Sequence, residues 1–273
     1  MLLDTEIRRI SKAEMLNFGS GPSAYAFDYE AANVNGVNLA MTPSAFGMET
    51  AVLREYSPYF PKGCAAIFAV CPFSLGENQD NNNPSRYARY YGVLSRKAID
   101  ALPFPLPHWN SDVAKTVNSN FPLFPYDTGL NRDEVPTDDV MDERVKSMCR
   151  GWKEQLHLNN FTDASQAEFH RAAFAREKKA MLETLNTARA LGLRPFLLLP
   201  PLHSKLRKMV SKELFDEFVT RQITDAGVPI LDYTNDPMIT DQMFLGPVFL
   251  NRMGAKYLTE SVWNIVKKKD RNA

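Results

Sequence analysis

The hydrophobic positions of this chain form two patterns: short continuous apolar runs, and longer segments in which apolar residues recur every three or four positions. Five short runs stand out, at residues 15–18, 37–41, 65–71, 195–199 and 229–233. Each is followed by proline or by small polar residues. Continuous apolar runs of this length are typical of strands that are buried on both faces of a parallel sheet. We therefore predict five strands.

The longer segments have the spacing of amphipathic helices. They predict helices at 45–56, 86–100, 137–156, 163–192, 205–226 and 253–267. Asp163 and Gln166 have the spacing of a capping box at the start of the fourth of these helices, in which Phe169 is expected on the buried face. Met209 is expected on the buried face of the fifth. Residues 5–14 are predicted to be a polar lead-in without an element of their own.

Strands that alternate with helices predict an α/β protein, a three-layer α/β/α domain whose sheet has five parallel strands. The chain has 273 residues, of which 44% are hydrophobic. That is enough for one large core, so we expect a single domain over residues 1–273.

Residues 79–163 interrupt the alternation after the third strand. Their proline-dense stretch at 103–109 favours irregular chain, and they lack the apolar repeat of a second core. We expect a large insertion here. It is either a lid or cap over the carboxyl edge of the sheet or a packing elaboration without a ligand.

Charge excludes some classes of partner. The chain carries 32 basic and 32 acidic residues, so its formal net charge is zero and no overall field attracts nucleic acid or an anionic membrane surface. No run approaches the roughly 18 apolar residues that a membrane span needs. The start of the sequence also reaches acidic residues before any long apolar region. We expect no nucleic-acid partner, no membrane span and, by default, a cytoplasmic location.

The cysteines and most of the histidines give no sign of a metal site. Cys64, Cys71 and Cys149 are an odd set without metal-type spacing, and they are expected to be reduced core residues. Three of the four histidines have no partner at ligand or triad spacing. We therefore expect no metal and no cofactor.

Three stretches share features with one enzyme family. They are the glycine loop after the first strand (Gly-Ser-Gly-Pro-Ser, 19–23), the polar loop after the second, and the run Asn-Arg-Met-Gly-Ala at 251–255. Together they resemble the SGNH (GDSL-type) hydrolase superfamily, especially its branch of esterases and polysaccharide O-acetyltransferases, over roughly residues 15–78 and 192–267. The resemblance implies a flavodoxin-like sheet. It also implies a serine nucleophile in Gly-Asp-Ser, a histidine base three residues after an aspartate, and an oxyanion hole.

This chain departs from the family pattern at every catalytic position. Gly-Asp-Ser aligns with residues 19–21, which places Gly21 at the nucleophile position. Asp-x-x-His aligns with 246–249, which places Gly246 at the aspartate and Phe249 at the histidine. Loss of even one triad member typically lowers the rate by on the order of 10⁴, because a hydroxyl is a weak nucleophile without its oriented base. The resemblance and its departures together predict a catalytically degenerate protein.

The former active-site cleft is then expected to bind an acylated or carbohydrate-type small molecule, or a protein partner. The carboxyl ends of parallel strands meet at one edge of a sheet, and ligands bind there in open α/β folds. The residues assigned to this cleft are Gly19, Ser20, Gly21, Ser23, Thr42, Ser44, Glu77, Asn78, His203, Phe249 and Asn251.

One alternative is that residues at other positions perform the catalytic chemistry of the family. Ser20 or Ser23 would act as nucleophile with His203, which follows the fourth strand at the same edge of the sheet, and the protein would be an active esterase or acyltransferase. The acids that could orient the histidine are Asp232, Asp236 and Glu77.

A second alternative is a dinucleotide-binding oxidoreductase. Residues 19–24 formally satisfy the pattern G-x-G-x-x-G/A after a strand. That fingerprint requires a long helix after the glycines and an acid about 20 residues further on. The acid would fall near Met41 or Thr42, where none stands, so the sequence favours this alternative least.

Overall fold

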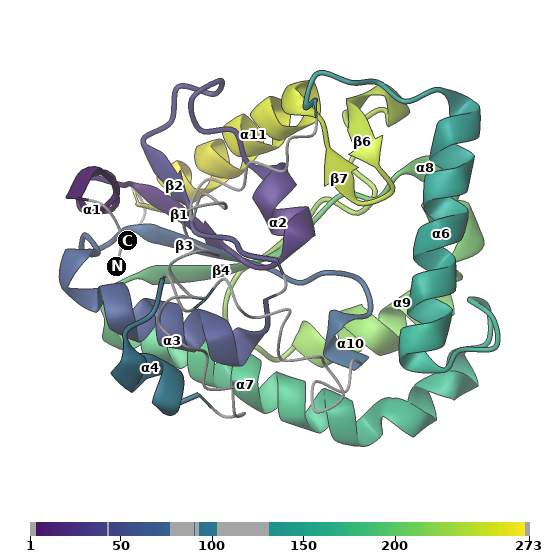
Figure 1. Ribbon diagram of the computed structural model, residues 1–273, viewed down its shortest axis with the longest axis horizontal. Helices are drawn as coiled ribbons and strands as arrows, with labels where there is room; N and C mark the ends of the chain where they lie inside the picture. Colours follow the sequence, from purple (N-terminus) through teal and green to yellow (C-terminus); the bar gives the residue numbers. More distant parts are fainter. Residues whose placement is uncertain (1–3, 43, 77–89, 91–92, 103–130, 271–273) are drawn as a thin grey trace.

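The computed structural model describes residues 4–42, 44–76, 90, 93–102 and 131–270. Their strands form a five-stranded, all-parallel sheet in the order β2-β1-β3-β4-β5 (Figure 1). This arrangement confirms the predicted α/β/α class, and the strand order is that of flavodoxin-like folds. The strands are β1 (Met15–Phe18), β2 (Gly36–Asn38), β3 (Ala65–Ala69), β4 (Arg194–Leu199) and β5 (Ile230–Asp232).

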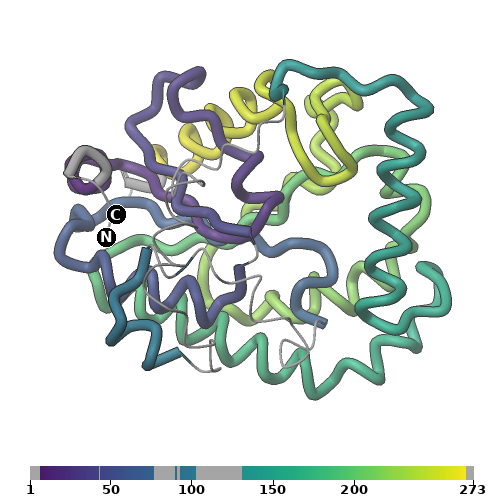
Figure 2. Tube along the Cα trace, in the orientation of Figure 1, coloured from purple at the N-terminus to yellow at the C-terminus, as the bar shows by residue number. Residues whose placement is uncertain are grey.

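Helices cover both faces of the sheet. In Figure 1, α3 and α7 pack together below the sheet, and α2 and α11 lie above it. Figure 2 traces the chain from α6, at the right-hand side, into α7 along the lower layer. The helices are α1 (Asp4–Ile10), α2 (Gly21–Ala26), α3 (Phe46–Tyr56), α4 (Arg96–Asp100), α6 (Asp138–Leu156), α7 (Arg171–Ala190), α8 (Ser204–Met209), α9 (Lys212–Phe215), α10 (Arg221–Ile223) and α11 (Arg252–Asp270).

The core explains why the strand sequences are continuous apolar runs. β3 pairs with β1 on one side and β4 on the other, and all five of its residues are buried. Phe18 of β1 stacks on Phe68 of β3 with ring centroids 4.9 Å apart. Leu53 of α3 and Leu258 of α11 are fully buried in the same core. Each such side chain stabilises the fold by about 1.5–3 kcal/mol, so both faces of the sheet select apolar residues.

Two predictions near the amino terminus need correction. The expected polar lead-in contains α1, whose Ile10 is fully buried. The second strand was predicted over 37–41, but β2 ends at Asn38. The Leu39 N–H still donates to the Asn17 carbonyl and the Met41 N–H to the Gly19 carbonyl, at 2.9 Å each. The chain therefore stays beside β1 until the glycine loop.

The helix predicted at 163–192 begins differently. Ala164–His170 form a 3₁₀ segment, and α7 follows it. The three-residue repeat turns Phe169 away from the core, and it is 89% exposed rather than buried. The Asp163 carboxylate accepts from the backbone N–H two residues on, at 2.9 Å. The Gln166 side chain donates to the Asp163 carbonyl instead of closing a capping box.

The helix predicted at 205–226 is also interrupted. α8 ends at Met209, and the Ser211 hydroxyl starts α9 by accepting from the Leu214 N–H at 3.1 Å. A π-helical segment, Asp216–Thr220, then leads into α10. Because the chain becomes extended at Val210, α8 stops at Met209. Met209 is 42% exposed, so the prediction that it is buried was wrong.

An antiparallel hairpin precedes the last helix. Within residues 244–251, where no strand was predicted, the chain forms β6 (Phe244–Gly246) and β7 (Phe249–Leu250). A Cβ atom on Gly254 of α11 would lie 2.5 Å from the Met243 carbonyl oxygen, so the helix can approach the hairpin this closely only with glycine. β7 in turn packs on α2, which brings the hairpin to the glycine loop.

The insertion at 79–163 is described in part. Its predicted helix at 137–156 is confirmed as α6, which contacts α8 and β6. The helix predicted at 86–100 is confirmed only as α4, which lies beside α3, because residues 93–95 are not helical and Ser95 caps the start of α4. Residues 77–89, 91–92 and 103–130 lie outside the described residues, so the lid or cap stays a prediction. Among the described helices, none is both long and apolar enough to cross a membrane.

Candidate functional site

The loop after β1 is shaped by glycine and closed by a buried serine. Gly19 has φ +129°, and a Cβ atom there would lie 2.9 Å from Ser23 Cβ, so the position requires glycine. The Ser23 hydroxyl donates to the Phe18 carbonyl at 2.7 Å and accepts from Asn17 Nδ2 at 3.1 Å. Ser23 is fully buried. It therefore holds the loop on the strand and does not line a cleft, contrary to the prediction.

Residues from opposite ends of the sequence, Gly21 and the hairpin residues Gly246 and Phe249, meet beside this loop. A Cβ atom on Gly21 would lie 3.1 Å from Phe249 Cε1, and one on Gly246 would lie 3.0 Å from Phe249 Cδ2. The Tyr25 ring packs on the same phenyl ring, with centroids 5.1 Å apart. The ring of Phe249 thus contacts both glycines, and Thr42 Oγ1 would lie 3.3 Å from the Gly21 Cβ position. At the three positions that align with the triad, Gly21, Gly246 and Phe249, no side chain could exchange a proton with a substrate.

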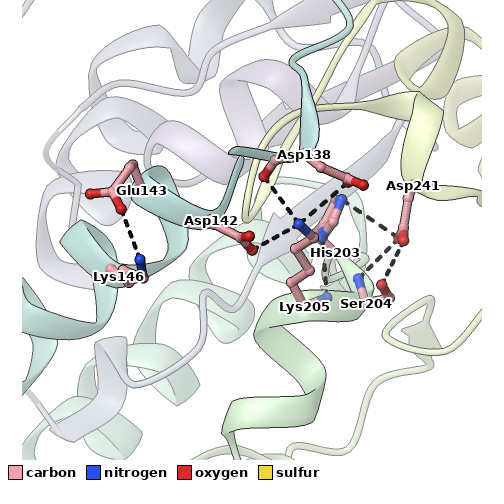
Figure 3. A network of polar contacts seen from close by, with 8 residues as sticks. All are labelled: Asp138, Asp142, Glu143, Lys146, His203, Ser204, Lys205 and Asp241. Carbon is pink, nitrogen blue, oxygen red and sulfur yellow. Dashed lines mark hydrogen bonds and ion pairs between the residues drawn. The ribbon is translucent and has the colours of Figure 1, made fainter. Parts of the chain in front are cut away.

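His203 belongs to a different cluster, shown in Figure 3. Its Nδ1 accepts from the Lys205 N–H at 3.2 Å, which caps α8, and its Nε2 lies 3.7 Å from Asp241 Oδ1. Both the N–H and the hydroxyl of Ser204 donate to Asp241. The ring packs edge-on against Phe244 and is buried, and this burial lowers the pKa of His203. The imidazole is therefore neutral at pH 7.

The displaced serine–histidine pair does not form in this structure. Within the described part of the chain, no hydrogen bond joins His203 to Ser20 or Ser23. Two of the three acids proposed to orient it, Asp232 and Asp236, accept hydrogen bonds from other residues. Asp232 accepts from the N–H and the hydroxyl of Thr234, and Asp236 accepts from the Tyr257 hydroxyl. The acid that does face His203 is Asp241, which no spacing in the sequence indicates.

Asn251 was predicted to line the cleft, but it lies at the start of α11. Asn251 is buried, its Nδ2 donating to the Gln242 carbonyl at 2.7 Å and its Oδ1 accepting from the Gly254 N–H at 3.1 Å. It caps α11 and does not face a cleft, which corrects the prediction.

The dinucleotide alternative requires a long helix after the glycines, whereas α2 has six residues. Glu77 and Asn78 lie outside the described residues.

Ser20 and Ser44 do line a cavity, a small one of about 30 Å³ at the carboxyl ends of β1 and β3. In a sheet of this strand order, the space between these two strands is where connections leave to opposite faces, and ligands bind at such a point. Ser20 Oγ lies 3.3 Å from Cys71 Sγ, and the Ser44 hydroxyl donates to Glu49 Oε1 at 3.2 Å. Ser74 lines the same wall.

Two buried glutamates complete this cavity, which we call the Glu49 pocket. Glu49 of α3 is 6% exposed, and burial raises its pKa from 4.5 to about 8, so it is protonated at neutral pH. Its Oε2 is buried and has no hydrogen-bond partner among the described residues. Glu177 of α7 is 5% exposed and forms an ion pair with Arg176, whose Nε lies 3.1 Å from Glu177 Oε1.

Sequence reasoning missed both glutamates, although a signal was present. Glu49 stands three and four positions before Val52 and Leu53 on the buried face of α3, and Glu177 stands four positions before the buried Met181 of α7. An acid on the apolar face of a helix is uncommon, since a buried charge is costly unless it is paired or neutralised.

The comparisons with known proteins do not add to this picture. No protein-family model matches the chain, and no curated protein matches it either. Within the described residues, no three His, Cys, Asp or Glu side chains are grouped so that they could hold a metal ion. The Glu49 pocket therefore presents hydrogen-bonding groups at the edge of the sheet. The Phe249 ring packs against the glycine loop that follows β1.

Proposed function

We propose that this protein is a non-catalytic relative of the SGNH hydrolases that binds an acylated or carbohydrate-type ligand at the carboxyl edge of its sheet. The contact of Phe249 with Gly21 carries the proposal, since Gly246 is paired with Phe249 in the same hairpin. The resemblance assigns these three positions to the triad from sequence order alone, and a triad requires them to be adjacent. An incorrect alignment would give no reason for Gly21, near the start of the chain, to touch Phe249.

Two buried polar atoms support a binding role. Thr42 Oγ1, beside Gly21, and Glu49 Oε2, in the Glu49 pocket, are both without a hydrogen-bond partner in the described structure. Buried polar atoms in folded proteins are nearly always hydrogen-bonded, and leaving one unsatisfied costs about 1–3 kcal/mol. A ligand that supplies the missing partners would recover this energy.

No observation favours the displaced-serine alternative. Ser23 donates its hydrogen to a backbone carbonyl, Ser20 lies against Cys71, and His203 caps α8. A nucleophile and its base must come within hydrogen-bond reach of each other, and these residues are held by other partners.

A fluorophosphonate probe, which attaches to activated serines, tests the proposal. We expect no labelling of the purified protein and no turnover of p-nitrophenyl acetate, with a known serine hydrolase as the positive control. Labelling that disappears in Ser20→Ala but persists in Ser44→Ala would overturn the proposal and establish the enzyme alternative.

A further inference from the structure

The Glu49 pocket has chemistry that narrows the class of ligand. The Ser44 hydroxyl donates to Glu49 Oε1, so this oxygen acts as an acceptor. A neutral carboxyl group carries its proton on one oxygen, and Oε2 is the one left for it. Oε2 is also the oxygen without a partner among the described residues. Glu49, which lines the pocket, therefore has a buried O–H donor that lacks an acceptor among the described residues.

The other polar groups of the pocket supply acceptors. The Ser74 hydroxyl donates to the Cys71 carbonyl at 2.8 Å, so its hydrogen is committed while its oxygen still has lone pairs. Ser20 likewise presents an oxygen to the pocket. Glu177 accepts from Arg176, which compensates its charge. One donor and several acceptors therefore face the cavity, and the charge of its carboxylate, Glu177, is paired with Arg176.

The size of the pocket limits what can enter. A water molecule needs about 10–15 Å³ measured in this way, so a cavity of about 30 Å³ admits a group of one or two heavy atoms. Ala45, Phe46 and Leu75 form an apolar part of its wall. A carbonyl only accepts hydrogen bonds, an ammonium only donates them, and a carboxylate adds a charge. A hydroxyl both accepts and donates and is neutral.

We propose that the Glu49 pocket binds the hydroxymethyl group of a neutral sugar or polyol, whose oxygen accepts from Glu49 Oε2 and whose hydrogen is donated to the serine oxygens. The methylene carbon would lie against the apolar wall. This inference rests on the proposed function and selects the carbohydrate-type ligand from its two classes. Within that class it specifies a free primary hydroxyl.

Saturation-transfer NMR with unlabelled monosaccharides tests this directly. Glucose and galactose are compared with their 6-deoxy counterparts, with 6-amino-6-deoxyglucose and with glucuronate. We expect the two hexoses to bind and each 6-deoxy sugar to bind at least tenfold more weakly, because it leaves the buried donor unsatisfied. The amino and carboxylate sugars should bind more weakly than glucose.

Two variants of Glu49 test whether glucose binding depends on this residue. Glu49→Leu keeps the volume but removes the donor, and it should weaken glucose binding at least tenfold, whereas Glu49→Gln keeps an N–H donor and should retain most of it. Glu213→Gln, on the exposed surface of α9, is the matched control and should bind as the wild type does. Circular dichroism of each variant shows whether it has folded.

Each other outcome contradicts the inference in a recognisable way. Equal binding of the hexoses and their 6-deoxy forms, or binding unchanged in Glu49→Leu, would overturn the inference and leave a carbohydrate-binding protein. Tighter binding of the amino sugar or the uronate would overturn the neutral-hydroxyl assignment. Absence of binding to every sugar would overturn the inference, while the fluorophosphonate experiment judges the non-catalytic function separately.

Discussion

Two clusters of polar side chains lie near the carboxyl edge of the sheet, and they differ in how completely they satisfy themselves. Around His203, Lys205 Nζ lies 2.8 Å from Asp142 Oδ1 and 3.3 Å from Asp138 Oδ1, while Ser204 and the imidazole face Asp241 (Figure 3). In the Glu49 pocket, one carboxyl oxygen is buried without a partner in the described structure.

This difference separates a structural role from a binding role. The His203 cluster joins the start of α8 to α6 and to the segment before β6. Lys205 pairs with Asp138 and Asp142, and Ser204 donates to Asp241, while the neutral imidazole has its Nε2 at 3.7 Å from Asp241. Such a network holds elements together and offers little to a ligand. In the Glu49 pocket, Glu49 Oε2 has no hydrogen-bond partner among the residues that the structure describes, as is expected of a binding site without its ligand.

The largest effect should come from Glu49 and appear as a pH dependence of stability. Folded Glu49 keeps its proton up to about pH 8, whereas the unfolded residue loses it near 4.5. The folded protein therefore binds more protons between these values, and this residue makes the free energy of unfolding fall as the pH rises, by about 1.4 kcal/mol per pH unit. Glu49→Gln should lack this fall.

Urea unfolding at pH 5, 6.5 and 8 measures it. The free energy of unfolding of Glu49→Gln should rise relative to that of the wild type with each step, while Glu213→Gln should follow the wild type. Parallel pH curves for Glu49→Gln and the wild type would show that Glu49 is already ionised or solvated. The contrast between the two clusters would then be lost.

The next effect concerns Phe249, whose ring contacts Gly21 and Gly246. Phe249→Ala should destabilise the protein by about 2 kcal/mol, less than the roughly 3–5 kcal/mol of a fully buried phenylalanine, because the ring is only half-buried. Phe169→Ala, which removes a ring that is 89% exposed, should change stability by less than about 0.5 kcal/mol. Similar values for both in urea unfolding would contradict the packing described for Phe249.

The smallest effect is expected at His203, and it lies at the opposite end of the pH scale. Burial lowers the pKa of folded His203 below its ordinary value of 6.5, and Asp241 only partly opposes this. Below pH 6.5 the unfolded state therefore binds more protons at this residue, so stability falls as the pH drops. His203→Asn, which keeps a helix-capping acceptor, should reduce that fall.

Thermal unfolding at pH 7 and pH 5 compares the two proteins. The difference in Tm between these pH values should be smaller in His203→Asn than in the wild type. His157→Asn is the control, because His157 is exposed and has φ +50°, a conformation that asparagine tolerates. An unchanged difference in His203→Asn would mean that the buried imidazole does not resist protonation.

The sequence by itself determined the layers and the edge at which a site would form. Continuous apolar runs specify strands buried on both faces, so the five parallel strands follow from hydrophobicity alone, and their small polar loops must share one edge. Residue identity also established that Gly21, Gly246 and Phe249 cannot perform acyl transfer. These properties follow from residue identity and local pattern, so they do not depend on how the helices and strands pack together.

Only the tertiary structure decided which of the polar residues face a ligand. The sequence alone does not show which of Ser20 and Ser23 faces a ligand. In the structure, the tight turn at Gly19 places the Ser23 hydroxyl on the Phe18 carbonyl, and Ser20 lines the pocket. Glu49 and Glu177 line one cavity because α3 packs on α7. Strand order and helix packing set the distances between loops. The free energy of ionising a buried carboxyl group depends on these distances more than on the residues next to it in the chain.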